Sequence, residues 1–153
     1  MRLLSLEVEN YRNIASASLT PGRELTVICG NNGQGKTNLL EAIWLLTGGK
    51  SFRGGKDAEL VRRGEPFAVL KASTLRAQQE EQEKEEPNRV RLTGGAPDAP
   101  RPGRTVSVNG GAVKRAASLA GSFPAVVFDP GHLSLVKGAP EGRRKFLDAA
   151  LCQ

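Results

Sequence analysis

A glycine-rich octapeptide constrains the fold of this chain more than any other feature. Residues 30–37 read Gly-Asn-Asn-Gly-Gln-Gly-Lys-Thr, which matches the pattern G-x-x-x-x-G-K-[ST] at every fixed position. In a loop of this kind, backbone N–H groups surround a phosphate, and the loop follows a strand and opens a helix. The octapeptide, called the P-loop below, therefore predicts an α/β fold that binds a nucleoside triphosphate.

The residues on either side of the P-loop have the composition that this arrangement requires. Residues 25–29 are apolar and partly β-branched, which predicts a strand buried on both faces. Residues 38–46 predict a helix whose apolar face is formed by Leu39, Ile43 and Leu46. Strand, loop and helix thus follow one another in the expected order.

The expected ligands of the triphosphate each have a chemical reason. Glycines permit positive φ and a close approach of the backbone to phosphate. Lys36 supplies a charge for the β- and γ-phosphates, near the positive end of the helix dipole, and Thr37 offers a hydroxyl to Mg²⁺. The predicted nucleotide-binding residues are Gly30, Asn31, Asn32, Gly33, Gln34, Gly35, Lys36, Thr37 and Asn38.

Composition limits the class of protein. The 153 residues form one domain or a piece of a larger protein. No stretch is apolar enough for a membrane span or a signal peptide, so we expect a cytoplasmic location. Cys29 and Cys152 make no disulfide framework or metal cluster, and Cys29 is expected to be buried at the end of the predicted strand. His132, the single histidine, is expected at the surface.

The net charge of +6 is unevenly distributed. Residues 78–86 carry five glutamates and one lysine, a local charge of −4. The positive excess of the remainder is compatible with a polyanionic partner such as DNA, although ribosomal or acidic protein partners would require the same charge.

Alternating patterns predict further strands. Residues 4–8 alternate between apolar and polar, and residues 15–19 are expected to pair back on them as a hairpin. A short helix is expected at 58–63 and a strand at 67–75. A small antiparallel layer thus precedes the predicted P-loop strand.

The second half of the chain contains a polar segment at about 77–104, which predicts an insertion or a long hairpin loop. Residues 89–92 and 105–108 alternate and are expected to be the arms of that hairpin. Asn109-Gly110 then predicts a tight turn.

Residues 125–128 are apolar and lead to Asp129. No glutamate follows and Pro130-Gly131 turns the chain, so we do not expect the Mg²⁺-binding acidic strand of a P-loop enzyme there. Pro140 predicts the start of a helix.

Several stretches together resemble the RecF family, bacterial recombination-mediator ATPases related to SMC proteins and ABC-type ATPases. The P-loop alone would not separate this family from any SMC-like head, whereas the last stretch is much more particular. The stretches are Asn10-Tyr11-Arg12-Asn13-Ile14, residues 33–43, Lys50-Ser51-Phe52-Arg53, and Val136-Lys137-Gly138-Ala139-Pro140 running into Arg143-Arg144-Lys145-Phe146-Leu147-Asp148.

The resemblance implies an ABC-type (SMC/RecF-like) ATPase head, with a mixed sheet and an antiparallel β-layer. Residues 1–135 would be the amino-terminal portion of the head and residues 136–153 the start of a helical second domain. Arg12 and Arg53 lie in shared stretches, each after an aromatic residue, and are candidate nucleotide contacts.

The sequence departs from the family pattern in two respects. Gly131-His132 stands where an acidic pair is expected. The signature motif, the acidic Mg²⁺ strand with its catalytic glutamate and the switch histidine have no counterpart. The resemblance therefore implies a chain truncated before the second half of the ATPase core, with no catalytic residue of its own and inactive alone.

The resemblance further implies ATP and Mg²⁺ as cofactors, an ATP-dependent homodimer, and binding to gapped DNA and to junctions of double- and single-stranded DNA. RecR and RecO would be partners in loading RecA during DNA repair, replication, recombination and the SOS response. Two other interpretations remain open. One is a different P-loop NTPase such as a small kinase, for which no acceptor pocket or arginine-bearing lid can be assigned. The other is a nucleotide-binding fragment without activity.

Overall fold

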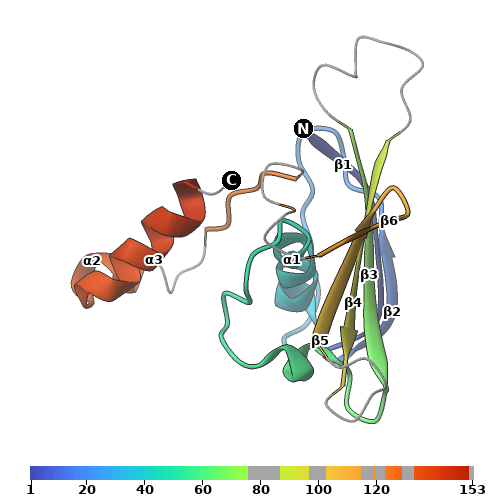
Figure 1. Ribbon diagram of the computed structural model, residues 1–153, viewed down its shortest axis with the longest axis horizontal. Helices are drawn as coiled ribbons and strands as arrows, with labels where there is room; N and C mark the ends of the chain where they lie inside the picture. The colour runs from blue at the N-terminus through green and yellow to red at the C-terminus, as the bar shows by residue number, and fades with distance from the viewer. Residues whose placement is uncertain (76–86, 97–102, 115–118, 120–122, 129–132, 152–153) are drawn as a thin grey trace.

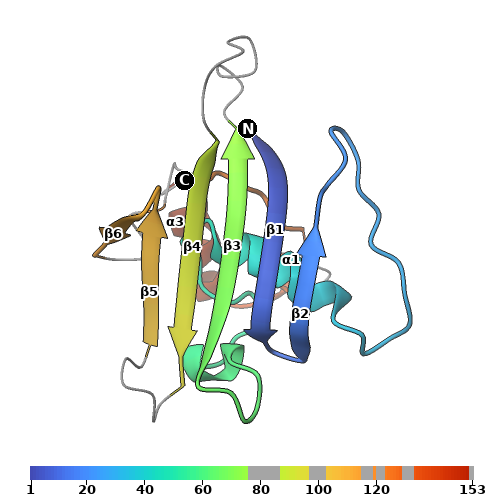
Figure 2. The same ribbon diagram turned by 90° about the vertical axis from the view of Figure 1, so that its right-hand side faces the viewer.

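The computed structural model describes residues 1–75, 87–96, 103–114, 119, 123–128 and 133–151. In these ranges the chain forms a six-stranded antiparallel sheet with the strand order β2-β1-β3-β4-β5-β6. Helix α1 covers one face of the sheet (Figures 1 and 2). The strands are β1 (Arg2–Tyr11), β2 (Ile14–Leu19), β3 (Phe67–Leu75), β4 (Asn88–Gly95), β5 (Gly103–Val108) and β6 (Gly111–Val113).

The first hairpin confirms the alternation seen in the sequence. Leu6 and Val8 are buried toward α1, whereas the alternate residues Glu7 and Glu9 are exposed. β2 pairs back on β1 and the hairpin closes where Tyr11 pairs with Ile14. The predicted strand at 67–75 is β3, which pairs with the other edge of β1.

The second hairpin is also where the pattern predicts it. β4 and β5 are antiparallel neighbours, with Arg91 opposite Ser107 and Leu92 opposite Val106. Asn109 and Gly110 have φ of 49° and 83° and turn the chain into β6, as expected of an Asn-Gly pair at a hairpin turn. Residues 77–86 and 97–102 of the predicted polar insertion lie outside the described residues.

Helix α1 (Lys36–Leu45) begins with the last two residues of the P-loop, two residues before the predicted start. Leu46 is buried, while Leu39 and Ile43 are partly buried against the core, so the predicted apolar face is confirmed. The deepest positions of the helix include two polar side chains, Asn38 and Glu41, which the apolar pattern did not single out.

The prediction of a buried strand at residues 25–29 was wrong. This segment has no strand hydrogen bonding, and it belongs to the long connection between β2 and α1 that extends beside β2 (Figure 2). Leu25 is 78% and Val27 71% exposed, and Cys29 is exposed as well. A strand is stabilised by hydrogen bonds to a neighbouring strand, and none of the described strands pairs with this segment.

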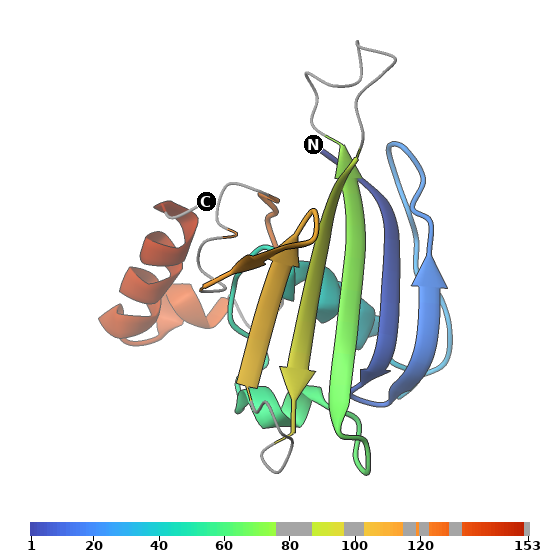
Figure 3. The same cartoon turned by 45° about the vertical axis from the view of Figure 1, so that its right-hand side comes forward.

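The remaining elements are short. The predicted helix at 58–63 is a 3₁₀ turn, η1 (Asp57–Leu60), followed by a single bridge between Val61 and Tyr11. α2 (Leu133–Lys137) and α3 (Pro140–Leu151) lie on the α1 side of the sheet and farther from it (Figures 1 and 3), and α3 starts at the predicted proline. No helix within the described ranges is long and apolar enough to cross a membrane.

Candidate nucleotide-binding site

The P-loop has the backbone conformation that its glycines permit. Gly30, Gly33 and Gly35 have φ of 150°, 80° and 94°, values that residues with a Cβ adopt only with strain. Gly35 is also the N-cap of α1, and Lys36 is the first residue of the helix. The first N–H groups of a helix have no partner within the helix. The loop and the helix start therefore form a place where backbone donors can meet an anion.

The side chain of Lys36 folds back over the loop. Its Nζ donates hydrogen bonds to the backbone oxygens of Gly30 at 2.7 Å and Asn31 at 2.8 Å. Thr37 is exposed at the second position of α1. Its hydroxyl and the oxygens of a bound phosphate are the hard ligands that Mg²⁺ prefers, so the residues present fit a magnesium ion that arrives with the nucleotide.

The turn between β1 and β2 hydrogen-bonds to the P-loop and to the first turn of α1. Asn13 donates from Nδ2 to the backbone oxygen of Gly33 at 2.7 Å, and its Oδ1 accepts from Nδ2 of Asn38 at 2.7 Å. A Cβ on Gly35 would lie 2.9 Å from Asn13 Oδ1 and 3.1 Å from Ile14 Cγ1. Only glycine therefore fits between this turn and the start of the helix.

The two predicted arginines contact neighbouring buried residues of α1, Asn38 and Glu41, in different environments. Arg53 is exposed and its Nη1 donates to Oδ1 of Asn38 at 2.5 Å, within one turn of the P-loop. Arg12, which has a positive φ of 54°, directs its guanidinium at Glu41. Arg53 thus contacts the residue that follows the P-loop, beside the predicted phosphate site. Arg12 instead contacts the buried carboxylate of Glu41, one turn farther along α1.

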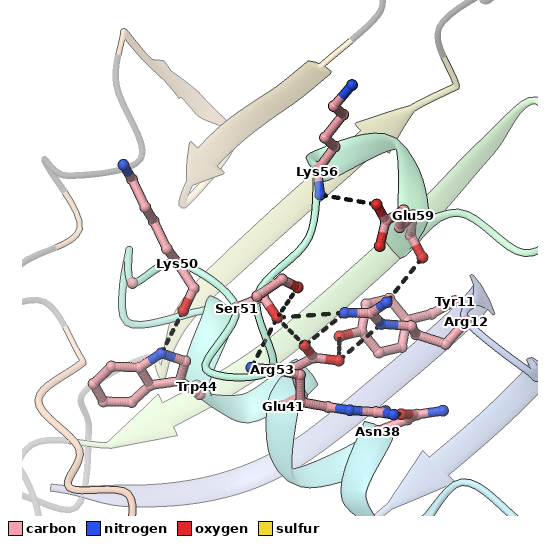
Figure 4. Close-up of polar contacts among 12 residues, drawn as sticks. Tyr11, Arg12, Asn38, Glu41, Trp44, Lys50, Ser51, Arg53, Lys56 and Glu59 are labelled. Atoms are coloured by element: carbon pink, nitrogen blue, oxygen red, sulfur yellow. Dashed lines mark hydrogen bonds and ion pairs between the residues drawn. The ribbon is translucent and has the colours of Figure 1, made fainter. Parts of the chain in front are cut away.

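Glu41 is the centre of a buried polar cluster (Figure 4), which comprises Tyr11, Arg12, Glu41 and Ser51. Its Oε2 accepts from Tyr11 Oη at 2.7 Å and from Arg12 Nε at 2.9 Å. Its Oε1 accepts from Arg12 Nη2 at 2.8 Å and from the Ser51 hydroxyl. The side chain of Glu41 has no exposed surface. Every contact of its carboxylate is therefore a donor from another segment of the chain.

The cluster sets the protonation states of its members. Burial acts to raise the pKa of Glu41, but hydrogen bonds from Arg12, Ser51 and Tyr11 outweigh it and hold that pKa below its usual value. Burial and the neighbouring Glu41 raise the pKa of Tyr11. The hydrogen bond to Glu41 raises the pKa of Arg12. At neutral pH the cluster therefore holds one carboxylate, one guanidinium and a protonated phenol.

Sequence reasoning missed Asn13, Glu41 and Ser51 as members of the site. All three lie in the stretches that carried the family resemblance, which was the available signal. Glu41 also occupies the same side of α1 as Ala42 and Leu45, so a charged residue interrupts an apolar face. Asp129 and His132, which were not expected to bind metal, lie outside the described residues.

Comparison with known proteins identifies the family to which this chain belongs. A family model described as AAA domain matches residues 5–95. The chain is 38% identical over 153 residues to a DNA replication and repair protein RecF of Syntrophotalea carbinolica, covering 100% of this chain and 39% of that protein. It is 43% identical to the RecF of Anaeromyxobacter dehalogenans, covering 98% and 38%. The chain thus spans well under half the length of these relatives.

Solved structures agree with the sequence comparison. The recombination mediator protein RecF-ATPrS of the RecFOR pathway superposes with a TM-score of 0.86 at 32% identity, over 99% of this chain and 38% of that one. A structure concerned with ATP-driven dimerization and DNA-stimulated activation of SMC ATPases gives a TM-score of 0.69 at 21% identity, over 95% and 97%, which shows a shared fold. The chain therefore belongs to the AAA domain family, has the fold of RecF and SMC head ATPases, and is RecF-like along its whole length.

Proposed function

We propose that this chain binds ATP with Mg²⁺ at the P-loop as part of a RecF-type DNA repair ATPase. The observation that carries the proposal is the junction of the P-loop with α1, where three glycines with positive φ, an unpaired helix start and the Lys36 ammonium surround one small region. In this region the negative charge of a triphosphate would be stabilised from several directions.

Each residue of the junction has a distinct part in binding. Backbone N–H groups of the P-loop and of the first turn of α1 would donate to the α- and β-phosphates. Lys36 would exchange its two carbonyl acceptors for β- and γ-phosphate oxygens, which are stronger acceptors because they are charged. Thr37 would hold Mg²⁺ through its hydroxyl, and the metal would supply positive charge at the triphosphate.

The proposed role in the cell is based on the RecF proteins to which the chain is similar. RecF proteins are named for DNA replication and repair, and solved RecF structures are of the nucleotide-bound recombination mediator. We extend this to an ATP-dependent homodimer that binds gapped DNA and, with RecO and RecR, helps to load RecA in the cytoplasm. The positive net charge of the chain supports a polyanionic partner.

Nucleotide binding is tested by calorimetric titration of the 153-residue chain with Mg²⁺-ATP. Wild type should bind, and Lys36→Ala should lose measurable binding while keeping its thermal transition, because the described hydrogen bonds of the Lys36 ammonium are to the P-loop carbonyls of Gly30 and Asn31. Lys71→Ala is the matched control, since it removes a lysine from the opposite face of the sheet. A folded wild-type chain that binds no ATP would refute the proposal.

DNA binding is tested by the affinity for gapped DNA with and without ATP at two salt concentrations. A mediator should lose affinity steeply as salt rises, because bound phosphates release counterions, and ATP should change that affinity. A metabolic P-loop enzyme would show neither effect.

A further inference from the structure

A buried ion pair such as Arg12–Glu41 is by itself weak evidence that the charge of Glu41 serves stability alone. Replacing a buried ion pair by well-packed apolar side chains is often neutral or stabilising. α1 buries Ala42 and Leu45 beside Glu41, so an apolar residue at position 41 would continue the packed face. The cluster is instead fully hydrogen-bonded on both carboxylate oxygens, which is the arrangement that fixes the geometry of its donors.

One of these donors, Ser51, lies in the loop after α1 and hydrogen-bonds both to α1 and within the loop. The Ser51 hydroxyl donates to Glu41 and accepts from the backbone N–H of Arg53 at 3.2 Å. The N–H of Gly54 in turn donates to the backbone oxygen of Ser51 at 3.3 Å. Glu41 therefore fixes the tight turn at residues 51–54 against α1, and with it the direction in which the Arg53 side chain leaves the loop.

Arg53 is the first member of a directional relay toward the P-loop. Its Nη1 donates to Asn38 Oδ1, Asn38 Nδ2 donates to Asn13 Oδ1, and Asn13 Nδ2 donates to the Gly33 oxygen. Arg53 only donates, and each of the two asparagines accepts through Oδ1 and donates through Nδ2, so the hydrogen bonds polarise one another in one direction. A peptide group is trans and planar, so holding the oxygen of Gly33 on the Asn13 side turns the N–H of Gln34 to the opposite side.

We infer that Glu41 is a positioning residue for the P-loop, because it fixes the turn at Ser51 and so holds Arg53 on the relay that ends at the Gly33 carbonyl. Glu41 does not touch the nucleotide. It orients the backbone N–H donors of the P-loop before ATP binds. This preorganisation raises affinity because binding then costs less conformational entropy. The affinity readout of this inference rests on the proposed function.

The first test is titration of the full chain with Mg²⁺-ATP. Ser51→Ala and Glu41→Gln should weaken binding about tenfold, the equivalent of one charge-assisted hydrogen bond. Ser51→Thr keeps the hydroxyl and should restore affinity. Arg53→Ala should weaken binding as well, and Ser51→Ala should add nothing in the Arg53→Ala background, because both act through the same relay. Glu7→Gln and Ser18→Ala, exposed on the sheet, are the matched controls.

The second test needs no nucleotide. Amide hydrogen exchange of the apo chain should become faster at residues 31–36 in Ser51→Ala, 15 to 20 residues from the substitution along the chain. A purely local role of Ser51 would change only the loop and η1. Ser51 is partly exposed, so this variant keeps its fold and decides the inference even where Glu41→Gln does not fold.

The outcomes are separable. A wild-type chain that binds no ATP rejects the proposed function, and the exchange of the P-loop amides still decides the inference. A folded Ser51→Ala with wild-type affinity and unchanged exchange at residues 31–36 overturns the inference and leaves the proposed function intact. Additive losses in the Ser51→Ala/Arg53→Ala pair would overturn it as well, because they exclude a shared relay.

Discussion

The guanidinium of Arg12 binds both carboxylate oxygens of Glu41, with Nε 2.9 Å from Oε2 and Nη2 2.8 Å from Oε1. Side-chain exposure is 16% for Arg12 and 0% for Glu41, so the pair is largely shielded from water. Arg12 belongs to the β1–β2 turn and Glu41 to the second turn of α1. This two-bond contact therefore fixes the P-loop helix to the hairpin that supports the P-loop.

Arg12→Ala should destabilise the chain by about 3 kcal/mol, because it leaves a buried carboxylate without its charge partner. Urea unfolding followed by the fluorescence of Trp44, the single tryptophan, measures this. Lys71→Ala, which removes an exposed ion pair with Glu7, is the control and should cost less than about 1 kcal/mol. Equal losses in the two variants would show that the Arg12–Glu41 pair contributes no more than a surface contact.

Acid should remove the contribution of Glu41 to stability. Its folded pKa is lowered, so the contribution is present above the unfolded pKa of about 4.3 and is lost as pH falls through the folded value. The groups that face the carboxylate are Tyr11, Arg12 and Ser51, of which none titrates in this range. As pH falls below the unfolded pKa, wild type should lose stability more steeply than Glu41→Gln. Parallel curves of urea midpoint against pH would contradict the lowered pKa.

Thr37→Val should separate metal-assisted from metal-free binding. The substitution keeps the shape of the side chain and removes the hydroxyl, which is the group expected on Mg²⁺. ATP affinity measured with Mg²⁺ should fall about tenfold or more, whereas affinity in EDTA should change little. Thr20→Val, exposed after β2, is the matched control. A similar loss in both conditions would assign Thr37 to phosphate binding instead.

Gly35→Ala should damage the fold and the nucleotide site together. The new Cβ would meet Asn13 and Ile14 in addition to the strain of a φ of 94°. Gly64→Ala is the control, since Gly64 has a φ of 89° with nothing within 4 Å of the added carbon. The free energy of unfolding of the control should fall only by the cost of the strained φ, about 1–2 kcal/mol. Gly35→Ala should lose more by thermal unfolding and should bind ATP poorly, and equal losses would rule out the close approach.

The sequence determined the features whose causes are local. The glycines of the P-loop, the helix that follows them, the alternating strands at 67–75 and 105–108 and the Asn-Gly turn each depend on residues adjacent in the chain. The structure confirms these elements, and the helix begins two residues earlier than predicted. The resemblance of short stretches also indicated the RecF-like fold correctly.

Only the tertiary structure decided which polar side chains meet. Glu41 hydrogen-bonds to Tyr11 and Arg12, which are 30 and 29 residues away, and no local pattern specifies such a contact. The prediction of a strand at residues 25–29 was wrong because it relied on local composition alone. The composition of this segment suits a strand, but a strand exists only where a neighbour accepts its hydrogen bonds, and none of the described strands does so. Local sequence determines backbone conformation, whereas pairing and burial depend on segments that are distant along the chain.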